Sequence, residues 1–137
     1  MSDTVRLTMP AKAEYLILAR LALAGIAREV AMSEEALADL KLAVTEACGN
    51  AVRHAYPADG GVVRVVYEVD SDVIDVTVED EGSGIPFEDL PADPLVDGDP
   101  AESGMGLAII RAVTDELEVT ERGGTRGTLV RMRKRLA

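Results

Sequence analysis

Aromatic residues, cysteine and histidine are scarce in this sequence. Its 137 residues include three tyrosines, one phenylalanine and no tryptophan, so a folded core must be built from aliphatic side chains. The single cysteine, Cys48, excludes an internal disulfide and fits a reducing compartment. Hydrophobic residues still make up 47% of the chain, which is enough for a packed core and excludes global disorder.

Basic residues are also few. The chain has 14 lysines and arginines against 25 aspartates and glutamates, which gives a formal net charge of −11. Phosphate backbones and anionic lipids repel such a chain, so we expect no direct binding to nucleic acid or membranes. The longest apolar run, residues 15–27, contains Arg20 and is shorter than the roughly 20 residues that cross a bilayer. Residues 1–10 lack the pattern of a secretory signal. We therefore expect a soluble, cytoplasmic protein.

The pattern of polar and apolar residues predicts one domain over residues 1–137, without internal repeats. Alternation and β-branched runs indicate strands, and helical spacing of apolar residues indicates helices, the second capped by Ser33. The expected strands cover residues 5–9, 62–69, 73–79, 117–121 and 128–133, and the expected helices cover residues 11–31, 34–55 and about 106–116. This order predicts an α+β fold, a two-layer sandwich with a mostly antiparallel sheet and three helices. Residues 85–103, rich in Pro, Asp and Gly, are a candidate functional lid.

The predicted helix over residues 34–55 carries a line of polar side chains. Glu46, Asn50 and His54 are spaced by four residues, and Arg53 falls in the same sector. Leucine, valine and alanine residues form an apolar stripe on another face. A carboxylate, an amide and a guanidinium in one line can bind a metal ion and phosphates beside a general base. The same pattern is also typical of a solvated helix face, so this motif alone leaves both interpretations open.

Two glycine-containing segments lie at the ends of predicted elements. Asp80 ends a strand ahead of Gly82 and Gly84, where the backbone can approach a planar ligand and the carboxylate can accept hydrogen bonds from a ligand amine. Gly104 and Gly106 open a helix, whose first N–H groups suit an anionic phosphate. Each segment alone is equally typical of an ordinary turn or hinge.

The order of four segments is more specific than any one of them. Glu-x-x-x-Asn on a helix, Asp-x-Gly-x-Gly after a strand, Gly-x-Gly-Leu at a helix and Gly-Thr at a final strand succeed one another between residues 40 and 132. This series resembles the GHKL ATPase family, which includes gyrase, MutL-type proteins and histidine kinases. The resemblance implies the Bergerat ATP-binding fold, a two-layer α/β sandwich with a mostly antiparallel mixed sheet.

The resemblance also implies roles for individual residues, with ATP and Mg²⁺ as cofactors. Asn50 would hold the magnesium ion that bridges the phosphates, and Arg53 would contact phosphate. Asp80 would accept a hydrogen bond from the adenine amino group, with Thr128 assisting through water. The remaining residues expected to border the base or the phosphates are Gly82, Gly84, Gly104, Met105 and Gly106.

Glu46 is the most informative residue of the resemblance. Histidine kinases usually carry Asn at this place, whereas members with Glu activate a hydroxyl of water or of a protein serine or threonine. Gyrase-like and MutL-like proteins are several times longer, so the chain looks most like the bacterial anti-sigma-factor serine/threonine kinases of the RsbW type. This implies a homodimeric protein kinase, with Glu46 as base, that sequesters a sigma factor and phosphorylates an anti-sigma-factor antagonist.

Two other functions stay open at this point. Residues 68–102 contain 13 acidic and no basic side chains, so this segment offers no cation to the γ-phosphate. A non-catalytic, nucleotide-binding anti-sigma switch protein is therefore one alternative. A detached histidine-kinase ATPase domain is a weaker one, because Glu46 stands where Asn is expected and no phosphoacceptor helix pair precedes it.

Three further patterns have structural interpretations. The basic run at residues 131–135 predicts charged edge residues that discourage pairing between sheets. Cys48 lies on the apolar side of its helix and is expected to pack in the core. The first predicted helix, including Arg20, is either a partner-docking surface or a core helix with one arginine at its rim.

Overall fold

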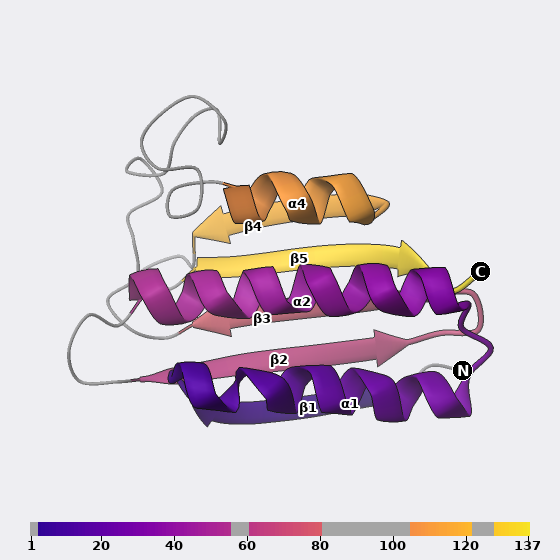
Figure 1. Cartoon of the computed structure of the whole chain (residues 1–137), viewed down its shortest axis with the longest axis horizontal. Coiled ribbons are helices and arrows are strands. Elements are labelled where there is room, and N and C mark those ends of the chain that lie inside the picture. Colours follow the sequence, from indigo (N-terminus) through magenta and orange to yellow (C-terminus); the bar gives the residue numbers. More distant parts are fainter. Residues whose placement is uncertain (1–2, 56–60, 81–104, 122–127) are drawn as a thin grey trace.

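The computed structural model describes residues 3–55, 61–80, 105–121 and 128–137, and the side chains of residues 53–55, 105 and 121 lie outside the described set. Figure 1 shows how the helices and strands follow one another along the chain. The elements are β1 (Asp3–Pro10), the 3-10 helix η1 (Ala13–Tyr15), α1 (Leu16–Glu29), α2 (Glu34–Ala55), β2 (Val62–Val69), β3 (Val73–Asp80), α4 (Met105–Val113), β4 (Glu116–Glu121) and β5 (Thr128–Arg135).

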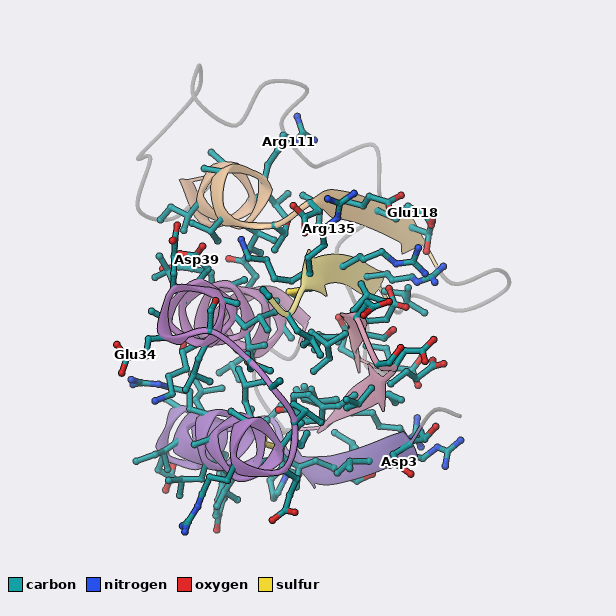
Figure 2. All side chains as sticks on the ribbon, turned by 90° about the vertical axis from the view of Figure 1, so that its right-hand side faces the viewer. Asp3, Glu34, Asp39, Arg111, Glu118 and Arg135 are labelled. Atoms are coloured by element: carbon teal, nitrogen blue, oxygen red, sulfur yellow. The ribbon has the colours of Figure 1, made fainter. Side chains whose placement is uncertain are left out.

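The strands form one sheet in the order β1-β2-β3-β5-β4, and every described pairing is antiparallel. Helices α1, α2 and α4 lie side by side on one face of this sheet, with α2 in the middle (Figure 1). Turned by 90°, the molecule shows the two layers, helices on one side and strands on the other (Figure 2). The predicted α+β two-layer sandwich is thus confirmed. No helix in the described residues is both long and apolar enough to span a membrane.

The core lies between the helices and the sheet. Strands β2 and β3 bury every second residue, as their β-branched alternation predicts. The core side chains of the described residues are mostly aliphatic, and the one aromatic among them is Tyr67 of β2. Its hydroxyl donates a 2.6 Å hydrogen bond to the carbonyl oxygen of Ala19 in α1. This bond joins the outer helix to the sheet through the middle of the core.

Helix α2 begins and packs as its sequence predicts. The backbone N–H of Ala36 donates a 3.0 Å hydrogen bond to Ser33 Oγ, which confirms the cap. The stripe that contains Leu40 and Val44 is buried against the sheet. Cys48 is also fully buried, and this burial raises the pKa of its thiol to about 12. The prediction that Cys48 packs in the core is confirmed.

The basic run at the end of the chain was expected at a sheet edge, and this expectation is wrong. Strand β5 lies between β3 and β4, so its arginines have neighbours on both sides. Arg133 donates hydrogen bonds of 2.9 and 3.0 Å to the two carboxylate oxygens of Asp75 in β3, and these bonds raise the pKa of Arg133. On the opposite face of the strand, Lys134 Nζ lies 3.0 Å from Asp39 Oδ2 in α2. The positive run therefore compensates acidic neighbours within the fold.

Helix α4 is shorter than predicted. It ends at Val113, whereas the sequence pattern predicts a helix that continues to about residue 116. Thr114 Oγ1 donates a 2.7 Å hydrogen bond to the carbonyl of Ile110, and the N–H of Asp115 donates one of 2.8 Å to the carbonyl of Arg133. These bonds turn the chain into β4 one residue earlier than expected.

Candidate functional site

The C-terminal half of α2 faces the first turn of α4. A Cβ atom placed on Gly106 would lie 3.0 Å from Asn50 Nδ2 and 3.1 Å from Glu46 Oε2. Such distances are shorter than ordinary carbon contacts, so only glycine fits here without displacing a neighbour. The structure thus brings Glu46 and Asn50 together with Gly106, from segments far apart in the sequence.

Sequence periodicity explains how this contact forms. Glu46 and Asn50 lie one turn apart on α2, on a face next to its buried stripe, and both are half-buried. Helix α4 is amphipathic, and Ile110, one turn after Gly106, is fully buried in the core. Burial of Ile110 in the core therefore orients α4 so that its first turn lies against the polar face of α2.

The first turn of α4 adds an electrostatic feature. The first N–H groups of a helix have no carbonyl partner within the helix and lie at the positive end of its dipole. In α4 these groups belong to the turn that contacts the amide and the carboxylate. Backbone donors, an amide oxygen and a carboxylate at one place suit a phosphate group and the cation that accompanies it.

Asp80 is the only charged side chain among the described residues that is buried in the fold. It ends β3 and is 4% exposed. Alternation places it on the same side of the strand as Val76 and Val78, which face the helices. A buried carboxylate requires hydrogen-bond donors, and an amino group of a planar ligand at the end of the strand would supply one.

Thr128 begins β5 next to Asp80. Val78 pairs with Val130 and Glu79 with Leu129. Continuing this antiparallel register by one residue sets Thr128 opposite Asp80, on the helix-facing side of the sheet. The end of β3, the start of β5, the end of α2 and the start of α4 all lie at the left-hand end of the molecule in Figure 1.

Several predicted site residues fall outside what the structure describes. Gly82, Gly84 and Gly104 lie outside the described residues, as does the predicted lid at residues 85–103. Arg53 and Met105 belong to α2 and α4, but their side chains are outside the described set. The roles assigned to these residues stay predictions.

A magnesium ion is compatible with the donors that the structure describes. Within the described ranges, no group of three or more His, Cys, Asp or Glu side chains is placed to hold a metal ion. Magnesium does not need such a cage, because it keeps waters and takes its other ligands from one or two side chains and from phosphates. The amide oxygen of Asn50, 3.3 Å from the Cβ position of Gly106, is an oxygen ligand of the required kind.

The sequence reasoning missed the side-chain contacts of Gly106. It expected this glycine to supply a backbone amide, whereas the structure also packs its Cα face directly on Glu46 and Asn50. The available signal was a glycine in the first turn of a strongly apolar helix, where alanine would be the better helix former.

Sequence comparison identifies the class of domain to which this two-layer fold belongs. Residues 9–134 match the family described as the histidine kinase-like ATPase domain. The chain belongs to this family.

Within the family, the similarity is to proteins of the RsbW type. The protein named serine-protein kinase RsbW of Bacillus thuringiensis (strain Al Hakam) is 30% identical over 123 residues, which cover 85% of this chain and 77% of that protein. The protein of the same name in Bacillus cereus (strain Q1) is 31% identical, and the match again covers 85% of this chain and 77% of that protein.

Solved structures agree on the fold. The structure of the RsbU and RsbW domains of Rv1364c from Mycobacterium tuberculosis matches with a TM-score of 0.72 at 22% identity. The match covers 98% of this chain and 32% of that one, so this chain spans about a third of its length. The histidine kinase domain of a blue-light activated kinase from Erythrobacter litoralis matches with a TM-score of 0.60 at 30% identity, covering 93% of this chain and 62% of that one.

Proposed function

We propose that this chain binds ATP with magnesium and transfers the γ-phosphoryl group to a serine or threonine of a partner protein. The observation that carries the proposal is the contact of Gly106 with both Glu46 and Asn50. It supports a site in which phosphate-binding amides, a metal ligand and a general base lie within one turn of each other. The names of the curated relatives, serine-protein kinase RsbW, support the same reaction class.

The two ends of the nucleotide would be held by different elements. At the sheet end, Asp80 would accept a hydrogen bond from the adenine amino group, with Thr128 assisting through water. Gly82 and Gly84 would leave room for the base. At the helix end, the amides around Gly106 would bind phosphate.

The remaining phosphate contacts are assigned to polar residues of α2 and to the residues before Gly106. Asn50 would hold magnesium, and the ion would supply positive charge that neutralises the phosphates. Arg53 would add a positive charge, and Gly104 and Met105 would extend the row of backbone donors.

Glu46 would act as the general base. Its carboxylate takes the proton of the acceptor hydroxyl as that oxygen attacks the γ-phosphorus. The bond from this phosphorus to the β–γ bridging oxygen breaks, so the products are ADP and a phosphorylated serine or threonine. A histidine acceptor would need no such base, which is why the carboxylate favours a hydroxyl acceptor over a detached histidine-kinase ATPase domain.

The proposed biological setting follows from the family resemblance. We propose that the chain is a cytoplasmic anti-sigma factor, that a sigma factor is its binding partner and that an anti-sigma-factor antagonist is its phosphorylation substrate. The RsbW-type relatives support this setting at the level of the family.

The second candidate function is a nucleotide-binding anti-sigma switch that transfers no phosphate. The 13 acidic and no basic side chains in residues 68–102 favour it, because an acidic segment offers no cation to the γ-phosphate. The two functions share the nucleotide site and differ only in the chemical step.

Replacement of Glu46 by Gln separates these functions. The substitution keeps size and polarity but removes the base, so phosphorylation of candidate antagonists by radiolabelled ATP should fall by about 100-fold or more while ATP binding persists. The phosphoprotein formed by the wild-type chain should be stable to acid, as phosphoserine and phosphothreonine are. Equal labelling by the variant would contradict the role of Glu46, and no labelling by the wild type would favour the switch.

A further inference from the structure

Leu42 is an exposed apolar residue next to the residues proposed for catalysis. It is 43% exposed and precedes Glu46 by four residues, which is one turn of α2. An exposed leucine alone needs no explanation, but this one has a fixed position relative to the proposed base. We propose that Leu42 receives an apolar side chain of the phosphoryl acceptor, located two residues from the serine or threonine that is phosphorylated. This inference rests on the proposed kinase function and adds a substrate preference to it.

The face of α2 that carries Leu42 points away from the sheet. Leu40 and Val44, two residues before and after it, are fully buried, and two residues along a helix turn a side chain by about 200°. Ala38, one turn before Leu42, is exposed as well. Figure 2 shows Glu34, one further turn back, on the side of α2 that faces away from the sheet. Ala38 and Leu42 form an apolar strip, here called the α2 strip, that leads along the outside of the helix layer to the proposed base.

The nucleotide side of Glu46 is defined by Asn50 and Gly106. Asn50 lies one turn further along α2, and the Cβ position of Gly106 is 3.0 Å from its Nδ2 and 3.1 Å from Glu46 Oε2. The proposed phosphate and metal contacts therefore lie on the Asn50 side of the carboxylate. In phosphoryl transfer the attacking and leaving oxygens lie roughly in line, on opposite sides of the phosphorus. The acceptor hydroxyl accordingly reaches Glu46 from the other side, where Leu42 lies.

Helix and strand geometry sets the position of the contact in the acceptor. A general base must come within about 2.6–3.2 Å of the hydroxyl oxygen, so the phosphorylated residue lies directly over Glu46. Four residues of α2 span about 6 Å along its axis. Two residues of an extended chain span about 6.6 Å, and their side chains lie on the same face. The side chain two positions from the acceptor serine or threonine therefore lies over Leu42.

The chemistry of the α2 strip selects an apolar side chain at this position. The side chains of Leu42 and Ala38 contain no polar atom. A leucine of the acceptor that lies on the strip removes its own apolar surface and that of Leu42 from water. A charged side chain at the same place gives up part of its hydration and gains no partner from the strip. The acceptor segment should therefore carry an apolar residue here and not a charged one.

Synthetic peptides test this preference. Each peptide carries one serine in a background of glycine and asparagine, with a single leucine at one of the positions from four residues before to four residues after the serine. With radiolabelled ATP and magnesium, kcat/KM should be about 10-fold higher for leucine two residues from the serine, on one side of it, than for the peptide without leucine. The gain should appear as a lower KM, because the contact holds the acceptor both before and during transfer.

Substitutions of Leu42 connect the preference to the α2 strip. Leu42→Asn removes the apolar contact at nearly constant size, so it should raise KM for the best peptide by about 10-fold and leave kcat unchanged. Leu42→Met should retain the preference, because its side chain is still apolar. The matched control is Val5→Asn on the edge strand β1, an apolar position that is 38% exposed, and it should behave as the wild type. Circular dichroism should show all three variants folded, since both positions are exposed.

Two results overturn the inference. One is an equal kcat/KM for leucine at every position, and the other is a preference that persists in Leu42→Asn, which would mean that another surface binds the acceptor. Labelling of a candidate antagonist by the same preparation distinguishes these failures from failure of the proposed function. A chain that labels the antagonist without a leucine preference among the peptides contradicts only the inference. A chain that labels neither the antagonist nor any peptide contradicts the proposed kinase function and the inference with it.

Discussion

Gly106 is the residue on which the geometry of the candidate site depends most. A methyl group added to its Cα would lie 3.0 Å from Asn50 Nδ2 and 3.1 Å from Glu46 Oε2. Gly25, a glycine inside α1, has no neighbour within 4 Å of the corresponding methyl position. The two glycines therefore form a matched pair for testing the site by the smallest possible substitution.

Gly106→Ala should weaken binding of Mg·ATP by about 10-fold or more, because the new methyl displaces the two polar side chains or the first turn of α4. Gly25→Ala should leave nucleotide binding unchanged and stabilise the fold by about 0.5–1 kcal/mol, since alanine is the better helix former. Calorimetric titration and thermal melts measure both effects. Unchanged affinity in Gly106→Ala would contradict the described site.

The buried thiol of Cys48 leads to a prediction about how stability depends on pH. Burial raises the pKa of its thiol from 9.0 to about 12, so the folded protein keeps the proton that the unfolded chain loses. The stabilisation from this group is present below about pH 9 and is lost as the pH rises toward 12. Between about pH 9 and about pH 10.5, the free energy of unfolding should fall by about 2 kcal/mol through this thiol.

The control for this effect is Cys48→Ala, which has no thiol to titrate. Denaturant unfolding at a series of pH values should show a shallower decline for the variant than for the wild type. Tyr67 contributes to both curves, because burial and the nearby Cys48 raise its pKa as well. Parallel curves for the two proteins would show that Cys48 titrates normally and would refute its described burial.

At the scale of elements, the sheet and α2 were predictable, and the shape of the site was only partly so. Residues 34–55 and 62–69 were assigned with the observed bounds, because capping and β-branched alternation are local signals. The end of α4 and the position of β5 in the strand order were not predicted correctly, because both depend on contacts with residues distant in the sequence. Asp75 and Glu116, which neutralise Arg133, could not be identified before the strand order was known.

The candidate site shows the same limit. The spacing of Glu46 and Asn50 is visible in the sequence, but the contact with Gly106 depends on how α4 packs against α2. Asp80 and Thr128 are neighbours because of the register between β3 and β5, and the alternation of residues in each strand does not determine that register.

The attachment of α1 to the sheet yields a prediction at this scale. Tyr67→Phe removes the hydroxyl that donates a 2.6 Å hydrogen bond to Ala19, with little change in volume. The variant should lose about 1 kcal/mol of stability, and hydrogen exchange in α1 should become faster. Tyr15→Phe, on an exposed side chain, is the control and should change neither. An equal loss in both variants would show that the bond contributes nothing specific.

At the scale of the whole molecule, elements of the helix layer and of the sheet meet at one end of the sandwich. The nucleotide site is proposed at the end of the sandwich where α2 and β3 end and α4 and β5 begin (Figure 1).

Calorimetric titration of the chain with Mg·ATP is the most direct test of the central claim. We predict saturable binding of one nucleotide per chain to the wild type and to Glu46→Gln, and a loss of binding by about 10-fold or more in Asn50→Ala and in Asp80→Asn. The first variant removes only the base, whereas the other two remove a ligand of the metal and the acceptor for adenine. Absence of binding heat from the folded wild-type chain at several temperatures would contradict the account.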